Sequence, residues 1–156
     1  REFPKHPIIG VGGVVIHRNR VLLVQRGKEP SRGEWSIPGG MLELGEELTE
    51  GVRREIREET GLDVEPIEHI ATLDRVVRDD GKRSKVSRIR YHYVIVDYVC
   101  RLKGGKLAPA SDVMDARWVA APDLPRFKLT QAATLVIARA FEFMQKHPRR
   151  RSLRKA

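Results

Sequence analysis

Three glutamates in one short segment have the residue type and the spacing of a divalent metal site. Glu55, Glu58 and Glu59 lie in a stretch, Leu48–Thr60, that contains no proline and is followed by Gly61. Such a stretch predicts a helix that the glycine ends in a left-handed conformation. Because residues three and four apart share a helix face, these carboxylates should converge.

The alternative is a charged helix face that water solvates. The predicted buried stripe of Leu48, Val52 and Ile56 lies beside Glu55 and Glu59 rather than opposite them. Carboxylates that crowd at the edge of a core repel one another and tend to stay protonated. A bound cation removes this problem, and carboxylate oxygens suit Mg²⁺ or Mn²⁺. Such a triplet alone is still more typical of a solvated face, and the metal interpretation is favoured only when the longer motif around it is included.

The glutamates belong to a longer pattern with fixed spacing. Residues 40–62 read GMLELGEELTEGVRREIREETGL and fit the pattern G-x5-E-x7-R-E-U-x-E-E-x-G-U, in which U is aliphatic. The fixed positions are filled by Gly40, Glu46, Arg54, Glu55, Ile56, Glu58, Glu59, Gly61 and Leu62. This segment resembles the box of the Nudix (MutT-like) family, hydrolases that cleave nucleoside diphosphates linked to another group.

The resemblance implies a role for each of several residues. Glu55, Glu58 and Glu59 are expected to bind the metal, together with the carbonyl of Gly39 just before the box. Glu58 is the first candidate for the general base, and Glu55 and Arg54 complete the expected catalytic group. Arg54 and Glu58 are four residues apart, so Arg54 is expected to orient Glu58. A surface ion pair of little energetic worth is the alternative.

Other residues are candidates for substrate binding. Asp112 and Asp115 fall in a loop where many Nudix relatives place an extra acid, which makes them alternative bases; ordinary loop capping is the competing interpretation. Arg26 ends a predicted strand and is a candidate for holding phosphate, unless it is a solvated strand end. The box positions Gly40 and Glu46 complete this set. Two aromatic residues could stack on a base or belong to the core, Tyr91 and Phe127.

The flanks of the box bear on the substrate. The run Trp-Ser-Ile-Pro-Gly-Gly from Trp35 and the preceding Val-Leu-Leu-Val-Gln-Arg resemble small bacterial ADP-ribose pyrophosphatase-like proteins. However, Val77 stands where longer ADP-ribose pyrophosphatases have a proline. The resemblance implies hydrolysis of ADP-ribose or a similar nucleotide sugar. A nucleoside triphosphate pyrophosphohydrolase that acts on oxidised dNTPs is one alternative. A non-catalytic module that binds nucleotide or RNA is another.

The elements that must position these residues follow from hydrophobic periodicity and turn residues. The predicted strands are Ile8–His17, Val21–Gln25, Val64–Arg78 (as one strand or two), Ile89–Leu102 and Ala116–Ala120. A last helix should begin at Thr130 and stop before Pro148. Strands around one central helix, followed by a second helix, indicate an α+β fold. The resemblance implies an α/β/α sandwich around a mixed sheet, over residues 7–146.

Composition sets the remaining expectations. The 156 residues predict one domain over residues 1–148 and a basic tail over residues 149–156, which holds five of the nine net positive charges. That tail suits weak, salt-sensitive binding of polyanions. The lone Cys100 and the absence of a membrane-length apolar run favour a cytoplasmic protein with no membrane partner. The resemblance implies a small nucleotide as its partner. A homodimer is left open, and the first residue, Arg1, is not a methionine.

Overall fold

The computed structural model describes residues 1–79 and 88–148 of the chain. The predicted basic tail, residues 149–156, lies outside the described residues. The elements follow in chain order: strands β1 (Ile8–His17), β2 (Arg20–Arg26), β3 (Trp35–Ser36) and β4 (Gly39–Met41), helix α1 (Leu48–Thr60), strands β5 (Leu62–Asp79), β6 (Arg88–Gly105) and β7 (Val113–Ala120), a 3-10 helix (Ala121–Arg126) and helix α2 (Gln131–Lys146).

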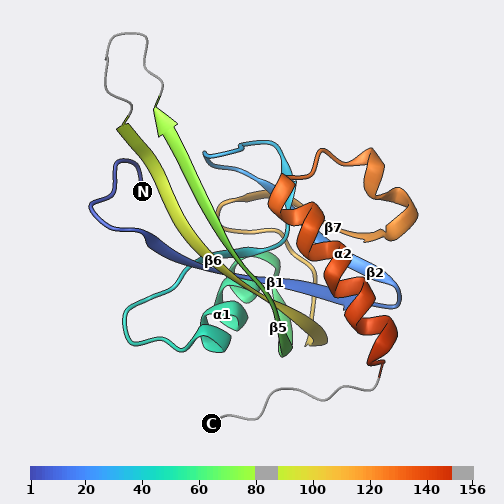
Figure 1. Ribbon diagram of the computed structural model, residues 1–156. Coiled ribbons are helices and arrows are strands. Elements are labelled where there is room, and N and C mark those ends of the chain that lie inside the picture. Colours follow the sequence, from blue (N-terminus) through green and yellow to red (C-terminus); the bar gives the residue numbers. More distant parts are fainter. Residues whose placement is uncertain (80–87, 149–156) are drawn as a thin grey trace.

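The strands form one mixed sheet between the two helices (Figure 1). Strands β3, β2, β1, β6 and β5 follow one another across it, while β7 also pairs with β2 and β4 with β1. The β1–β6 pair is parallel and the other pairs are antiparallel. The order places β1 at the centre, against α1 on one face and α2 on the other.

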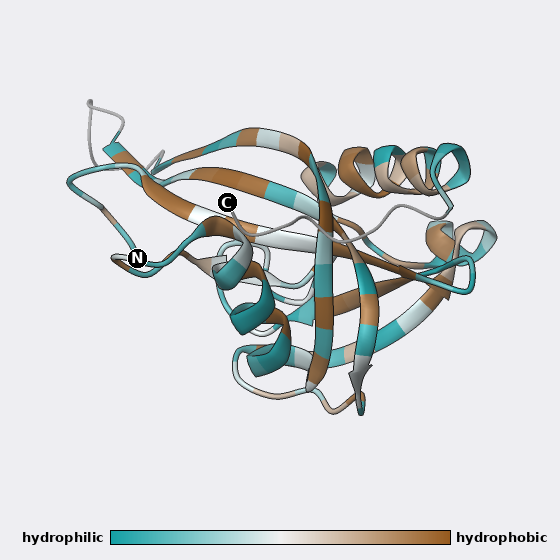
Figure 2. Cartoon of the chain, turned by 90° about the horizontal axis from the view of Figure 1, so that it is seen from below, coloured by the Kyte–Doolittle hydropathy of each residue, from teal (hydrophilic) through white to brown (hydrophobic). Residues whose placement is uncertain are grey.

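The side chains of β1 alternate between two cores, as a strand's period of two requires. Val11 and Val15 pack with Val52 and Ile56 of α1. Val14 and Ile16 pack on the other face, with the buried residues of α2, which are Ala133, Val136, Ile137 and Ala140. Figure 2 shows hydrophobic residues along the strands and hydrophilic ones on the outer side of α1. This arrangement is the α/β/α sandwich that the resemblance implied.

Both helices begin and end where local signals predict. Helix α1 starts at Glu47, whose backbone N–H donates to the Glu50 carboxylate over 3.2 Å, and Gly61 ends the helix at φ 76°. Helix α2 is capped by Thr130, whose hydroxyl accepts a hydrogen bond from the Ala133 N–H. Capping of this kind satisfies backbone groups that have no partner inside the helix.

The strands differ from their predicted bounds in three respects. Strand β5 is continuous over 18 residues, with register irregularities that accommodate Pro66. Strand β7 begins at Val113, because that residue pairs with Arg26 beyond the irregularity at the end of β2. The short strands β3 and β4 were not predicted, since they depend on pairing with β2 and β1 rather than on a periodic pattern of their own.

Two buried polar features of the sheet are relevant to function and stability. Cys100 is fully buried, and burial raises the pKa of its thiol. Asp97 in the centre of β6 is 2% exposed, and its Oδ1 has no hydrogen-bond partner among the described residues. The Asp97 carboxyl lies over Gly12, where a Cβ atom would come within 2.4 Å of Oδ1.

In the described part of the chain, no helix is long and apolar enough to cross a membrane.

We expect Asp97 to make the stability of the fold depend on pH. Burial raises its pKa from 3.8 to about 7, so the folded chain keeps a proton that the unfolded chain has released. The resulting stabilisation is complete below pH 4 and is lost as pH rises through about 7. In urea unfolding, the free energy of unfolding of the wild type should fall between pH 5 and pH 8. For Asp97→Asn this fall should be smaller by roughly 2–3 kcal/mol, because the amide does not titrate.

The matched control for this measurement is Asp74→Asn, which changes an exposed residue of β5. The control should keep the wild-type pH dependence. An Asp97→Asn protein that loses as much stability as the wild type over the same pH range would contradict the assignment of a buried, protonated Asp97.

Candidate active site

The glutamates of α1 differ in burial along one side of the helix. Glu59 is 8% exposed, and its Oε2 accepts a hydrogen bond of 3.1 Å from the backbone N–H of Gly39. The side chain of Glu55 is largely buried, and that of Glu58 is half exposed. Burial raises the pKa of Glu59 to about 8, against the opposing effect of the Gly39 N–H. Burial also raises the pKa of Glu55. A nearby cation would favour the ionised form of both carboxyls.

Arg54 supplies one such cation and connects four parts of the site. Its Nε and Nη2 donate to the two oxygens of Glu46 over 2.6 and 3.0 Å, and Nη2 also donates to the Met41 carbonyl over 2.9 Å. Its Nη1 donates to Glu55 over 2.8 Å and to Glu58 over 3.3 Å. Arg54 therefore contacts Glu58 as predicted, but its shorter bonds go to Glu46 and Glu55.

Glu46, predicted as a substrate-binding residue, forms a bidentate pair with Arg54. Its carboxylate binds Arg54 with both oxygens, and its Oε2 also accepts a bond of 3.0 Å from the Glu43 N–H. Bonding to Arg54 lowers the pKa of Glu46 below its usual value. Such a bidentate pair is strong and directional. Glu46 thus holds Arg54 in place, and its direct contact with substrate stays a prediction.

The glycines of β4 allow the backbone to approach the helix closely. A Cβ atom on Gly40 would lie 2.4–2.6 Å from the carboxylate atoms of Glu55, and one on Gly39 would lie 2.3 Å from the Val11 carbonyl oxygen. Only glycine permits both contacts, because real Cβ atoms do not approach other atoms so closely. The Gly-Gly pair therefore belongs to the site as well as to the sheet, and the metal contact of the Gly39 carbonyl stays a prediction.

The chemistry of the donors fits a hard divalent cation. Glu55 and Glu58 lie on either side of one guanidinium nitrogen, that of Arg54 Nη1, which shows that a positive charge fits between them. Within residues 1–79 and 88–148, no three acidic, histidine or cysteine side chains converge closely enough to enclose an ion as they stand. A metal held here would therefore combine these carboxylates with water and substrate oxygens, as Mg²⁺ usually does.

The structure brings Arg26 and Asp112 towards Glu59 and places Asp115 in strand β7. The charge of Arg26 lowers the pKa of Glu59, and that of Asp112 raises it. Arg26 donates from Nε to the Pro30 carbonyl over 2.7 Å, which leaves the outer guanidinium nitrogens for other partners. Asp112 pairs with Lys28 over 2.8 Å. Asp115 lies inside β7, paired with Gln25, and not in a loop as the sequence predicted; its carboxylate accepts hydrogen bonds from the Ala116 N–H and from Arg117.

The two aromatic candidates make packing contacts. Tyr91 is 4% exposed, and its hydroxyl donates to Glu2 over 2.9 Å. Phe127 meets Trp35 edge to face, with ring centroids 5.0 Å apart. Both therefore fit the core alternative better than stacking on a base.

One charged residue near Arg26 was not identified from the sequence. Arg75 of β5 is partly buried, and its Nη2 donates to the Ser31 hydroxyl over 2.6 Å. In a strand that alternates polar and apolar residues, an arginine usually lies on the solvated face. The local sequence pattern therefore did not predict that Arg75 is partly buried. Only the pairing of β5 with β6, and the loop that contains Ser31, enclose it.

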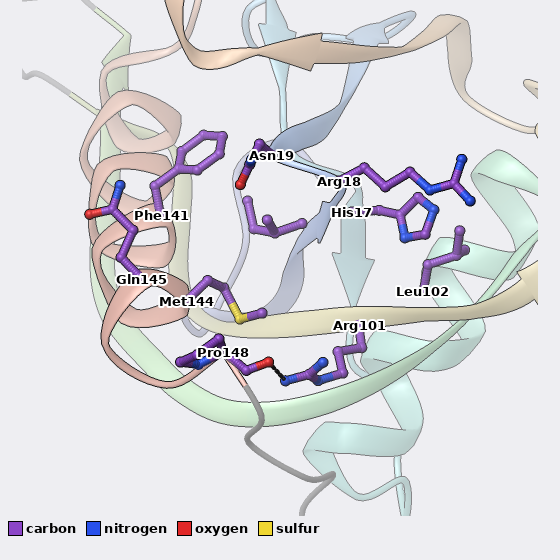
Figure 3. Close-up of a pocket in the computed structure, with 10 residues that line it drawn as sticks. His17, Arg18, Asn19, Arg101, Leu102, Phe141, Met144, Gln145 and Pro148 are labelled. Atoms are coloured by element: carbon purple, nitrogen blue, oxygen red, sulfur yellow. Dashed lines mark hydrogen bonds between the residues drawn. The ribbon is translucent and has the colours of Figure 1, made fainter.

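A separate cavity of about 420 Å³ lies at the other end of β1 (Figure 3). Its lining includes the turn at Arg18 and Asn19, the end of β6 at Arg101, and Phe141 and Met144 of α2. Arg101 donates to the Pro148 carbonyl over 2.8 Å at its edge. None of the predicted site residues lines this cavity.

The glutamate helix beside a Gly-Gly strand, on a sheet covered by helices on both faces, defines the Nudix class of proteins. A family model described as the NUDIX domain matches residues 6–140. The chain belongs to the NUDIX domain family.

Known proteins support this membership. The chain is 31% identical over 121 residues to the ADP-ribose pyrophosphatase of Methanocaldococcus jannaschii, over 78% of this chain and 66% of that protein's length. The MutT NUDIX hydrolase of Burkholderia pseudomallei is 26% identical, with a TM-score of 0.72 and coverage of 86% of this chain and 98% of that one. The NUDIX domain of Shewanella oneidensis NrtR, solved in complex with ADP ribose, is 25% identical, with a TM-score of 0.68 and coverage of 90% of each chain.

Proposed function

We propose that this chain is a metal-dependent pyrophosphohydrolase that cleaves the diphosphate bond of ADP-ribose or a similar nucleotide sugar. The single observation that carries this proposal is the arrangement of α1 against β4. Glu55, Glu58 and Glu59 lie on one side of the helix, and the first two share Arg54 while the third accepts the N–H of Gly39. Carboxylates held this way provide oxygen ligands for Mg²⁺ or Mn²⁺.

The residues of the chain divide the work of hydrolysis. Glu55 and Glu59, held by Arg54 and Gly39, form the rigid part of the metal site, and the half-exposed Glu58 is free to reach water and act as base. Arg26 binds a phosphate oxygen at the neighbouring strand end. When bound, a divalent cation neutralises phosphate charge and makes a water molecule more acidic. Positioning and charge neutralisation account for most catalysis of phosphoryl chemistry.

The choice of substrate rests on similarity to named proteins. The relative from M. jannaschii is named an ADP-ribose pyrophosphatase, and the NUDIX domain of NrtR was solved with ADP ribose. A second candidate is a nucleoside triphosphate pyrophosphohydrolase that acts on oxidised dNTPs. It is supported by 45% identity over 49 residues to the human protein named 8-oxo-dGDP phosphatase NUDT18, whose name records an oxidised nucleotide. We also propose that the protein works in the cytoplasm, since its lone Cys100 is a buried thiol that suits a reducing compartment.

We expect ADP-ribose to be cleaved to AMP and ribose 5-phosphate, because attack on either phosphorus splits the diphosphate bond into two monophosphates. Chromatography of products from a panel with Mg²⁺ or Mn²⁺ would measure this. The panel should contain ADP-ribose, a nucleotide sugar, a dNTP, 8-oxo-dGTP and a dinucleoside polyphosphate. Excess EDTA should abolish turnover of every member.

Each other outcome of the panel identifies a different function. A kcat/KM for 8-oxo-dGTP or a dNTP far above that for all nucleotide sugars would overturn the substrate choice in favour of the triphosphate candidate. ADP-ribose binding without turnover in either metal would indicate a non-catalytic nucleotide-binding module. Turnover that persists in excess EDTA would overturn the metal mechanism itself.

A further inference from the structure

Arg75 lies on the sheet surface next to the candidate active site. It pairs with Tyr93 in the β5–β6 register, and Tyr93 pairs with Ile8 of β1. Tyr93 shares its side of β6 with Val99, which packs under α2, because residues an even number apart on a strand share a face. Arg75 is near the C-terminal end of β5, and Figure 1 shows α2 away from that end of the strand.

The loop after β2 brings Arg26 to the same place. The loop closes on itself at Arg26, whose backbone N–H donates to Glu34 O and whose carbonyl accepts from the Gly33 N–H. Arg75 reaches this loop from β5, 44 residues further along the chain, through its bond to Ser31. Arg26 Nε donates to the carbonyl of Pro30 and Arg75 Nη2 to the hydroxyl of Ser31, so the two guanidinium groups are bound to consecutive residues of this loop. Burial lowers the pKa of Arg75, and the charge of Arg26 lowers it further.

This pair of like charges has no compensating salt bridge. Within the described residues, Arg26 and Arg75 hydrogen bond only to the neutral groups of Pro30 and Ser31. Glu34 attracts Arg75 at longer range and pairs with Lys128 over 3.6 Å. Partly buried arginines are usually paired with carboxylates, since an unpaired charge is costly to desolvate. Two adjacent arginines without such partners indicate a site for an anionic ligand.

The position of the pair relates that anion to the catalytic glutamates. Backbone hydrogen bonds link the end of β2 to Glu59, since Gly27 N–H donates to Asp112 O over 2.8 Å and Ala110 N–H donates to Glu59 O over 2.9 Å. Arg26 and Arg75 in turn bind the consecutive residues Pro30 and Ser31. A phosphate bound near Glu59 would therefore contact Arg26 first, and an adjoining phosphate would contact Arg75. Arginine suits this role because its planar fork of donors matches phosphate oxygens.

We propose that Arg75 is a substrate-binding residue which, together with Arg26, clamps the two adjoining phosphate groups of a diphosphate. This inference rests on the proposed function, since it takes the diphosphate to be that of the substrate. Arg75 lies outside the Nudix box, and the inferred clamp requires a ligand with two adjoining phosphate groups. The competing role for Arg75 is structural, the anchoring of the loop through Ser31.

The experiment measures binding and turnover separately. Isothermal titration with inorganic pyrophosphate in excess EDTA reports diphosphate affinity without metal or catalysis, and steady-state kinetics on ADP-ribose report KM and kcat. For Arg75→Gln we expect pyrophosphate affinity to weaken about tenfold or more, the range for loss of a hydrogen-bonded charge. KM should rise by a similar factor while kcat changes less than about threefold. Arg75→Lys, which keeps the charge, should recover part of the affinity.

Two control variants distinguish ligand binding from loop anchoring. Ser31→Ala removes the bond to Arg75 but keeps the charge, so pyrophosphate affinity should stay within about twofold of the wild type. Arg78→Gln changes an exposed arginine of the same strand and should also have little effect. Thermal unfolding verifies that each variant is folded.

Several results would overturn the proposal. Unchanged pyrophosphate affinity in folded Arg75→Gln would exclude diphosphate contact. An equal loss of pyrophosphate affinity in Ser31→Ala would show that Arg75 acts by anchoring the loop. An equal loss in Arg78→Gln would show that the effect comes from the net charge of the protein and not from a contact of Arg75. Because the titration needs no turnover, a protein that binds pyrophosphate through Arg75 but leaves ADP-ribose intact would sustain this inference while the proposed function fails.

Discussion

Glu58→Gln should lower kcat on ADP-ribose by about a hundredfold or more, while the protein stays folded. The substitution keeps the size of the side chain but removes a charge, a metal ligand and the first candidate base. Losing general-base or electrostatic help at a reacting centre commonly has an effect of this order. The fold should survive because Glu58 is half exposed and its described bond is the 3.3 Å contact from Arg54. Steady-state kinetics with saturating Mg²⁺ would measure the loss.

A remote glutamate provides the matched control for this variant. Glu142 lies on α2, is 63% exposed and pairs with Lys146 over 2.8 Å. Glu142→Gln removes the same charge from the same type of side chain and should leave kcat within about twofold, since surface ion pairs contribute little. Near-normal turnover by folded Glu58→Gln would exclude Glu58 from both the metal site and the base, and would direct attention to Asp112.

Gly40→Ala should reduce kcat/KM by roughly tenfold to a hundredfold with little loss of stability. The new methyl group would need the space of the Glu55 carboxylate, whose atoms lie 2.4–2.6 Å from the ideal Cβ position. The flexible end of Glu55 can move, so the sheet survives, but Glu55 then leaves its position 2.8 Å from Arg54. Displacing a group at an active site by about 1 Å can cost as much as a hundredfold in rate.

The control glycine for this variant is Gly104, near the end of β6. A Cβ atom there meets nothing within 4 Å, so Gly104→Ala tests the same chemical change in open space. We expect wild-type kinetics from it. We also expect weaker Mn²⁺ binding from Gly40→Ala, measured by titration. Normal activity and normal Mn²⁺ affinity in that variant would show that the position of Glu55 against β4 is not needed for catalysis.

Local signals were sufficient to predict the helices and the convergence of the three glutamates on one of them. The spacing of Glu55, Glu58 and Glu59 determines that they share one side of α1, because helix geometry repeats every 3.6 residues whatever surrounds it. Gly61 and Thr130 mark helix ends through backbone bonds within a few residues. The mixed sandwich itself followed from the resemblance to Nudix proteins that the box carries, rather than from periodicity alone.

The contacts that make the segment a site depend on residues distant in sequence. Gly39 donates to Glu59 across 20 residues, and Arg75 reaches Ser31 across 44. Neither contact has a local pattern, since each depends on which strands pair and in what register. A shift of one residue in β5 would turn Arg75 to the opposite face of the sheet.

Burial was likewise decided by the tertiary structure. Asp97 occupies a strand position whose pattern does not distinguish a solvated carboxylate from a buried one, and its surroundings come from Gly12 of β1. The sequence predicted Glu46 as a substrate-binding residue, and the fold adds Arg54 as its partner. Sequence spacing thus determined which residues face the same way, and only the packing of β1, β4 and β6 around them determined their partners, because desolvation and charge pairing depend on neighbours in space.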